Sequence, residues 1–391
     1  MQRYYFDHNA STPVSPAVLE VLVPALLEVY GNASSIHRDG QIAKQRLEIA
    51  RREVAQLLHC DAKEIVFLSG GTEADNLALQ GVVRAHPASK KHVITTTIEH
   101  PAVLNTCREL EQEGVSVTRV GVGSDGVVDP GDVRRALRPE TVLVSVMHAN
   151  NELGTIQPLE EISAITREAG VLLHSDGVQA AAKIPVDVHA LGVDLYSITG
   201  HKFYAPKGIG ALYVKKGTRL TPMQHGGRHE QGMRPGTENV PGAIALGRAA
   251  SLALADLPEE SRRLAGLRDR LEAGLLARVP SSGVNCGKAR RTPNTTNIFF
   301  DGLDGEPLLI SLDLKGFAVS SGAACSSGAV EPSHVLLAIG LSRERARASL
   351  RFSLGRSTTE EQVDALIDAV TESVAQLRKL SPTYMAGARN E

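Results

Sequence analysis

Short apolar runs alternate with amphipathic stretches between residues 63 and 214. The runs are rich in Val, Ile and Leu, and they predict strands that are buried on both faces. Seven such runs occur, at residues 64–68, 92–97, 115–120, 141–146, 171–174, 193–198 and 210–214. Because buried strands that are joined by helices form parallel sheets, the pattern predicts an α/β fold with a mainly parallel seven-stranded sheet and flanking helices.

Apolar positions repeat at a helical spacing in the stretches between these runs. They predict helices at residues 72–84, 101–113 and 159–168. Before the first strand, residues 41–58 predict a long helix. One apolar stripe runs along it, formed by Ala43, Leu47, Ala50, Val54 and Leu57.

A different pattern follows the glycine-rich stretch at residues 226–242. The predicted helices lie at residues 259–276, 306–314, 333–339 and 359–377, and the predicted strands at 296–301 and 348–353. Mixed helices and strands of this kind predict a smaller α+β domain. We therefore divide the chain into a large domain, residues 15–250, and a small domain that consists of residues 1–14 and 251–391.

The charge of the chain is almost balanced. In 391 residues, 42 Lys and Arg stand against 44 Asp and Glu, which gives a net charge of −2. No block of like charge stands out, so neither nucleic acid nor a membrane surface is an expected partner. The N-terminus shows no basic stretch followed by an apolar core, and we expect a cytoplasmic protein.

One of the four cysteines lies in an unusual setting. Cys60, Cys107, Cys286 and Cys325 are 47, 179 and 39 residues apart, which predicts neither a disulfide framework nor a Cys-x-x-Cys metal site. We expect no metal ion. Cys325 lies in a loop of small residues, where a thiol can move and stay accessible, so we favour a nucleophile over a packing cysteine.

Three features at strand ends together predict a site for pyridoxal phosphate. Residues 69–72 end a strand and open a helix, where backbone N–H groups either hold a phosphate or cap the helix. Asp176 also ends a strand, and two interpretations are open: it caps a helix, or it pairs with a pyridine nitrogen. Lys202 follows the next strand, and it is either a solvated surface charge or a Schiff-base amine. Such a site requires an anion seat, an acid and an amine, and the combination favours this interpretation.

The motifs resemble those of cysteine desulfurases of the NifS/IscS type, which are class V aminotransferases of fold-type I, and the resemblance covers nearly the whole chain. The matching segments are residues 5–13, 30–37, 70–76, 99–101, 147–152, 174–179, 200–202, 225–237, 320–334 and 351–356. Related transaminases share the lysine and acid motifs but lack the cysteine loop.

The resemblance implies a role for each site residue. Lys202 would carry the cofactor, Asp176 would pair with its pyridine nitrogen, and Gln179 would hydrogen-bond its ring hydroxyl oxygen. His100 would stack on the ring and move protons. The residues implied for the phosphate are Gly71, Thr72, Thr199 and His201, with Thr237 reaching in from a second subunit. Those implied for the substrate carboxylate are Asn151 and Arg351, since a planar guanidinium suits a carboxylate.

The implied reaction converts L-cysteine to L-alanine and leaves the sulfur on Cys325 as a persulfide. The sulfur would serve iron-sulfur cluster assembly or the synthesis of another thio-cofactor, through an acceptor or scaffold protein, and the active unit would be a homodimer. The alternatives are a selenocysteine lyase, another class V aminotransferase, or a non-catalytic partner protein of the same fold. Intact Lys202, Asp176, His100 and Cys325 favour an enzyme over the last of these.

Overall fold

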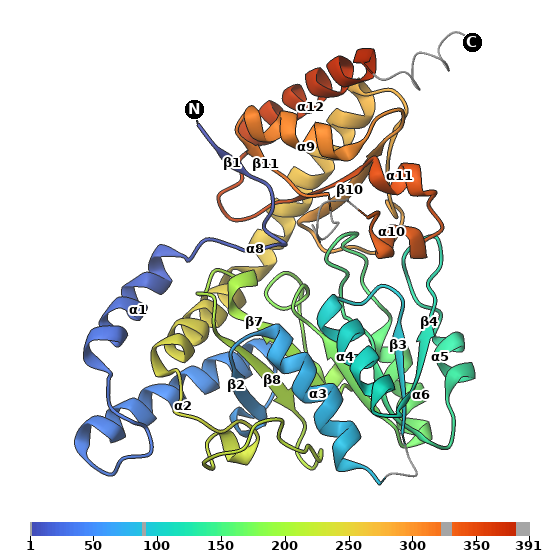
Figure 1. Ribbon diagram of the computed structural model, residues 1–391. Coiled ribbons are helices and arrows are strands. Elements are labelled where there is room, and N and C mark those ends of the chain that lie inside the picture. The colour runs from blue at the N-terminus through green and yellow to red at the C-terminus, as the bar shows by residue number, and fades with distance from the viewer. Residues whose placement is uncertain (1, 88–90, 322–330, 381–391) are drawn as a thin grey trace.

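A seven-stranded sheet forms the centre of the larger part of the molecule (Figure 1). The computed structural model describes residues 2–87, 91–321 and 331–380. The strands follow the order β2-β8-β7-β6-β5-β3-β4. Their bounds are β2 (Ile65–Leu68), β3 (His92–Thr96), β4 (Ser116–Val120), β5 (Thr141–Ser145), β6 (Leu172–Asp176), β7 (Leu195–Thr199) and β8 (Gly210–Val214). Only β8 runs antiparallel to its neighbours, which confirms the mainly parallel sheet predicted from the sequence.

Helices cover both faces of this sheet (Figure 1). On one face lie α3 (Gly71–Ala85) and α4 (Pro101–Gln112), and on the other lie α2 (Arg38–Leu58), α6 (Leu159–Ala169) and the first part of α8 (Val240–Arg278). Successive residues of β2 divide between the two faces, as strand geometry requires: Ile65 and Phe67 join one apolar cluster, and Val66 and Leu68 join the other. The short helices α5 (Pro130–Ala136) and α7 (Val188–Leu191) complete the larger part.

A separate apolar cluster, which contains Phe6, Phe300 and Phe352, forms the core of the smaller part. Its three-stranded antiparallel sheet has the order β12-β10-β9, and β1 pairs with β11 beside it. The strands are β1 (Tyr4–Tyr5), β9 (Ser282–Val284), β10 (Thr295–Phe300), β11 (Phe317–Ala318) and β12 (Ser349–Ser353). The helices are α9 (Gly305–Leu314), α10 (His334–Ala338), α11 (Arg343–Arg347) and α12 (Glu360–Leu380).

Helix α8 is much longer than the sequence predicted. A helix was expected at residues 259–276, but α8 begins at Val240 and contains Pro258 in its interior. Its first half is rich in Ala and Gly, which pack closely against α2 without forming a stripe of large apolar residues. Its most apolar stretch is long enough to cross a membrane by length and composition, but 56% of that stretch is buried within the protein. The domain boundary at residue 250 therefore falls inside one helix, and the division into domains stays a prediction.

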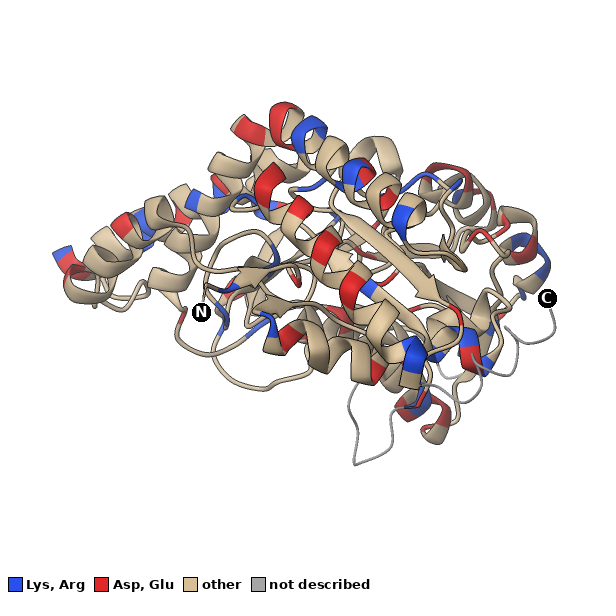
Figure 2. Cartoon of the chain, turned by 90° about the horizontal axis from the view of Figure 1, so that it is seen from above, with Lys and Arg blue, Asp and Glu red and all other residues tan. Residues whose placement is uncertain are grey.

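Helix α1 (Pro16–Glu28) was not predicted at all. Its apolar residues lie on every side, so the pattern shows no stripe of the kind that identified α2. Elsewhere on the molecule, charged residues of both signs are interspersed over the surface helices (Figure 2).

A buried ion pair holds the glycine-rich segment, residues 225–237, against the sheet. The Arg51 guanidinium donates to both carboxylate oxygens of Glu230, at 2.7 and 2.8 Å, and the Phe67 backbone N–H donates to the same carboxylate at 2.8 Å. The side chains of Arg51 and Glu230 are 9% and 3% exposed. The bidentate geometry and the extra N–H donor replace the water that both charges lose on burial.

We expect Glu230→Ala to lower the free energy of unfolding by about 3 kcal/mol, because the buried Arg51 then loses its bidentate partner and keeps only the more exposed Glu48 carboxylate and the Ile65 carbonyl. Urea unfolding followed by circular dichroism measures this loss. Glu168→Ala is the matched control, because the Arg134–Glu168 pair is largely exposed and removing it should leave the midpoint unchanged. Equal effects of the two substitutions would contradict the role given to the buried pair.

Candidate active site

A cleft of about 830 Å³ opens at the carboxyl ends of the parallel strands, where open α/β sheets bind ligands. The smaller part of the molecule contributes its other wall through Ser320, Ser333 and Arg351. Ten of the twelve site residues predicted from the sequence line this cleft: Gly71, Thr72, His100, Asn151, Asp176, Gln179, Thr199, His201, Lys202 and Arg351. Thr237 does not line the cleft of its own chain, and Cys325 lies outside the described residues.

Lys202 ends a short 3₁₀ helix, Gly200–Lys202, that directly follows β7. Its amino group donates to the backbone carbonyls of Asn9 and Ala10, at 2.5 and 2.9 Å. Burial lowers the pKa of Lys202 to about 8, with a further lowering by Arg351, although Asp176 acts in the opposite direction. A larger share of this amine is therefore neutral near neutral pH than for an exposed lysine, and the neutral form attacks aldehydes.

Asp176 is the last residue of β6 and is 5% exposed. One carboxylate oxygen accepts a hydrogen bond from the Val178 backbone N–H at 2.9 Å. Burial raises the pKa of Asp176, while the nearby His100, the hydrogen bond from Val178 and Lys202 act in the opposite direction. A buried carboxylate that lines the cleft suits a protonated ring nitrogen, because the ion pair compensates for lost hydration.

His100 is the N-cap of α4, and its Nδ1 atom accepts a hydrogen bond from the Ala102 backbone N–H at 3.1 Å. That bond places the hydrogen of the neutral ring on Nε2. Burial lowers the pKa of His100, which favours the neutral ring. A neutral imidazole in contact with the cleft can exchange protons in either direction.

The start of α3 provides the anion seat that the sequence predicted. A Cβ atom on Gly71 would lie only 2.8 Å from Cγ2 of Val178, so the backbone there approaches the cleft without a side chain in the way. Thr72 and Thr199 add hydroxyl groups to the same wall. Free N–H groups, the helix dipole and two hydroxyls are the donor set that a phosphate prefers.

Arg351 on β12 reaches the cleft from the smaller part. Its guanidinium donates to the Asn151 backbone carbonyl at 3.0 Å and to the Asp7 carboxylate at 2.7 Å, while its buried Nε has no hydrogen-bond partner among the described residues. The guanidinium is thus held in place in the lining of the cleft, where a planar cation suits recognition of a carboxylate. Together with the amine, the acid and the anion seat, this donor set fits pyridoxal phosphate and an amino acid.

Further polar residues in the cleft received no role from the sequence: Asn9, Asp75, Arg108, Glu152, Ser320, Glu331, Ser333 and His334. All of them except Arg108 lie within the matching motifs, and this was the signal in the sequence that could have identified them. Burial raises the pKa of Glu152 to about 7, and its carboxyl group accepts a hydrogen bond of 2.6 Å from Ser333. His334 Nε2 donates to the Glu99 backbone carbonyl at 3.0 Å. Both bonds fix the chain immediately after the segment that carries Cys325.

Comparison with known proteins agrees with this geometry. The family model described as aminotransferase class-V matches residues 4–366. The chain belongs to the class-V aminotransferase family. This membership, together with the relatives below, confirms the pyridoxal phosphate cofactor and the enzyme class predicted from the motifs.

The relatives of this class-V aminotransferase include curated cysteine desulfurases. One from Nostoc sp. is 48% identical over 382 residues, covering 98% of this chain and 95% of the relative. A cysteine desulfurase IscS from Methanosarcina thermophila is 46% identical over 378 residues, covering 97% and 93%. A solved NifS-like protein superposes with a TM-score of 0.91 at 38% identity, covering 96% of this chain and all of that one. The fold and the NifS/IscS resemblance are thereby confirmed.

The lowered pKa of Lys202 predicts how the protein takes up its cofactor. Because the reactive amine is the deprotonated form, the rate at which cofactor-free protein combines with pyridoxal phosphate should rise with pH, with a midpoint near 8 rather than near 10.5. Stopped-flow absorbance measures this rate. Arg351→Gln removes a positive charge that lowers the pKa, so its midpoint should move to higher pH. A parent midpoint near 10.5 would contradict the electrostatic account.

Proposed function

We propose that this protein removes the sulfur atom from L-cysteine, releases L-alanine and passes the sulfur through Cys325 to an acceptor. The observation that carries the proposal is the meeting of the Lys202 amine, the Asp176 carboxylate and the Arg351 guanidinium in one cleft with an anion seat. Relatives named cysteine desulfurase, at 43–48% identity over nearly the whole chain, favour this reaction over selenocysteine cleavage or transamination.

The residues of the cleft have different roles in this reaction. Bound pyridoxal phosphate supplies an electron sink for the charge left on the α carbon when its proton departs. Lys202 holds the cofactor and, once displaced by the substrate amine, is free to move a proton. Asp176 keeps the ring nitrogen protonated. Arg351 and Asn151 orient the substrate carboxylate, and His100 exchanges a proton with the substrate.

The sulfur step needs a nucleophile, and Cys325 is the candidate. Its thiolate attacks the substrate sulfur, the carbon–sulfur bond breaks with its electron pair returning to carbon, and a sulfur–sulfur bond forms on Cys325. A proton taken up by carbon completes alanine. Ser320 and Glu331, which are described residues on either side of the segment that carries Cys325, both line the cleft, and this supports the assignment. A thiol of the acceptor then takes the terminal sulfur.

We further propose a homodimer with shared sites. Thr237 is exposed and lies outside its own cleft, although Glu230 and Arg234 anchor the same segment to Arg51 and Glu73. Large apolar side chains are exposed along α1 and just after it: Leu19, Val23, Leu26, Leu27, Tyr30 and Ile36. An exposed apolar patch of this kind is typical of a surface that a second copy covers.

The acceptor belongs to iron-sulfur cluster assembly or to the synthesis of another thio-cofactor, and the reaction takes place in the cytoplasm. The name IscS carried by several relatives agrees with a general role in sulfur transfer.

Lys202→Ala should abolish both the visible absorbance of the lysine-bound cofactor and the release of alanine, because no other amine is assigned to the aldehyde. Absorbance spectra and borohydride labelling followed by peptide mapping test this. Label on a different lysine in the parent protein would overturn the assignment.

Cys325→Ala should retain the cofactor spectrum and still bind L-cysteine, because the residues assigned to the cofactor lie elsewhere. Release of alanine and sulfide should fall at least a hundredfold. Cys107→Ala is the matched control, because Cys107 is buried in a helix of the large core, and it should keep full turnover. Undiminished turnover by Cys325→Ala would return Cys325 to a packing role.

Shared sites predict complementation between two inactive chains. A chain with Lys202→Ala and a chain with Thr237→Glu should each form inactive homodimers. A mixed dimer should regain activity, because one of its sites then combines an intact Lys202 with an intact Thr237. Affinity tags on the two chains isolate the mixed dimer for assay. A fully active monomer in sedimentation, or an inactive mixed dimer, would refute the shared site.

A further inference from the structure

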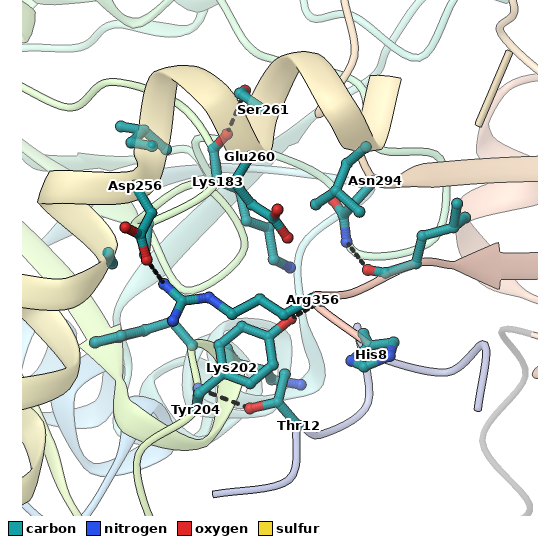
Figure 3. A pocket seen from close by; sticks show the side chains of 16 residues that line it. His8, Thr12, Lys183, Lys202, Tyr204, Asp256, Glu260, Ser261, Asn294 and Arg356 are labelled. Atoms are coloured by element: carbon teal, nitrogen blue, oxygen red, sulfur yellow. Dashed lines mark hydrogen bonds and ion pairs between the residues drawn. The ribbon is translucent and has the colours of Figure 1, made fainter. Parts of the chain in front are cut away.

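A second lysine, Lys183, lies close to the site. Lys183 follows β6 in a turn in which Ala182 adopts a φ of +64°, a conformation that non-glycine residues rarely take. Its backbone carbonyl accepts a hydrogen bond from Ser261 of α8 at 3.1 Å. Figure 3 shows its side chain and that of Lys202 in one cavity, which lies beside the main cleft.

The amino group of Lys183 contacts two amide oxygens and no carboxylate. It donates to Oδ1 of Asn9 at 3.0 Å and to Oε1 of Gln179. The carboxylates that line the same cavity already have partners, because Glu260 is held by Arg263 and Asp256 by Arg356. Within the described residues, Lys183 therefore has only neutral acceptors.

This contact decides which way the Gln179 side chain faces. An amino group offers hydrogens to both acceptors whether or not it is charged, so the oxygen of the Gln179 amide must face Lys183 and its NH₂ group must face away. One NH₂ hydrogen is donated to the Asn9 backbone carbonyl at 2.9 Å. The other has no acceptor among the residues that the structure describes, and Gln179 lines the cleft.

Asn9 is held from several directions and cannot turn to release this arrangement. It is 2% exposed, and its NH₂ group donates to Thr295 at 2.8 Å and to the Asn151 carbonyl at 3.0 Å. Its backbone carbonyl accepts from both Lys202 and Gln179. The two side chains assigned to the cofactor thus share one acceptor, and Lys183 fixes the residue that provides it.

We infer that Lys183 is a positioning residue for the cofactor: it orients the amide of Gln179 so that a hydrogen-bond donor, not an acceptor, faces the ring oxygen. The inference rests on the proposed function, which assigns Gln179 to that oxygen. Without Lys183, only the hydrogen bond to the Asn9 carbonyl favours this orientation, and an amide that turns over places its oxygen toward an oxygen of the cofactor.

A double-mutant cycle separates positioning from general damage. Lys183→Met and Gln179→Leu should each raise the dissociation constant for pyridoxal phosphate about tenfold, and each should shift the visible absorbance maximum of the bound cofactor in the same direction. The double variant should bind no more than about twofold more weakly than either single variant. Lys215→Met is the matched control, since Lys215 pairs with Asp194 and does not line the cleft, and it should change neither quantity.

Additive losses, about a hundredfold in the double variant, would overturn the inference and leave Lys183 a structural lysine. A parent protein that binds no pyridoxal phosphate would overturn the proposed function as well. If the parent protein binds pyridoxal phosphate but the losses of affinity in the double-mutant cycle are additive, the role of Lys183 is contradicted and the proposed function is not.

A second measurement needs no cofactor. In the full chain freed of cofactor, Gln179→Glu should leave the melting temperature unchanged or raise it, because the new carboxylate lies against Lys183. With Lys183→Met in place, the same substitution should lower it by several degrees, because the carboxylate is then buried and unpaired. If Lys183→Met does not fold, a lower melting temperature for Gln179→Glu alone overturns the contact. Equal effects in both backgrounds would do so too.

Discussion

Burial of charged groups is the constraint around which the cleft is built. Lys202, Asp176 and Arg351 are all largely removed from water. Lys202 and Arg351 are held by backbone carbonyls of distant segments, and Asp176 is held by the Val178 backbone N–H two residues further on. Such contacts replace hydration only when their geometry is good, so they fix the positions of the charges as well as compensating for burial. The chemistry of the site follows from that fixed arrangement, because an amine, an acid and a guanidinium held at set positions need little reorganisation when a substrate arrives.

The N-terminal segment joins the two cores through this cleft. Phe6 packs in the smaller core, and three residues later Asn9 contacts Lys183, which follows the central sheet. Between them, Asp7 holds the guanidinium of Arg351. A segment with almost no regular structure of its own therefore carries a large part of the alignment between the two walls.

The sequence predicted the central sheet and most of the cleft for a physical reason. Runs of Val, Ile and Leu mark doubly buried strands, and parallel strands place their carboxyl ends at one edge, so residues after those ends had to meet. Contacts between segments far apart in the chain leave no such periodic signal. Lys183 and Asn9 are 174 residues apart, and Lys183 alone has the pattern of an ordinary solvated lysine. Helix α1 and the first half of α8 were missed because they lack a clean apolar stripe.

Helix α8 gives the molecule a mechanical property that neither core would have alone. Its 39 residues extend about 58 Å as one rod, with residues up to Ala253 packed in the large core and residues from Leu264 onward in the small one. The two cores that carry the walls of the cleft are thus joined by a single helix. Pro258 lies between the two packed halves and removes a backbone hydrogen bond there, which makes it the softest point of the rod. A bend at this turn would tilt the two cores, and with them the walls of the cleft, relative to each other.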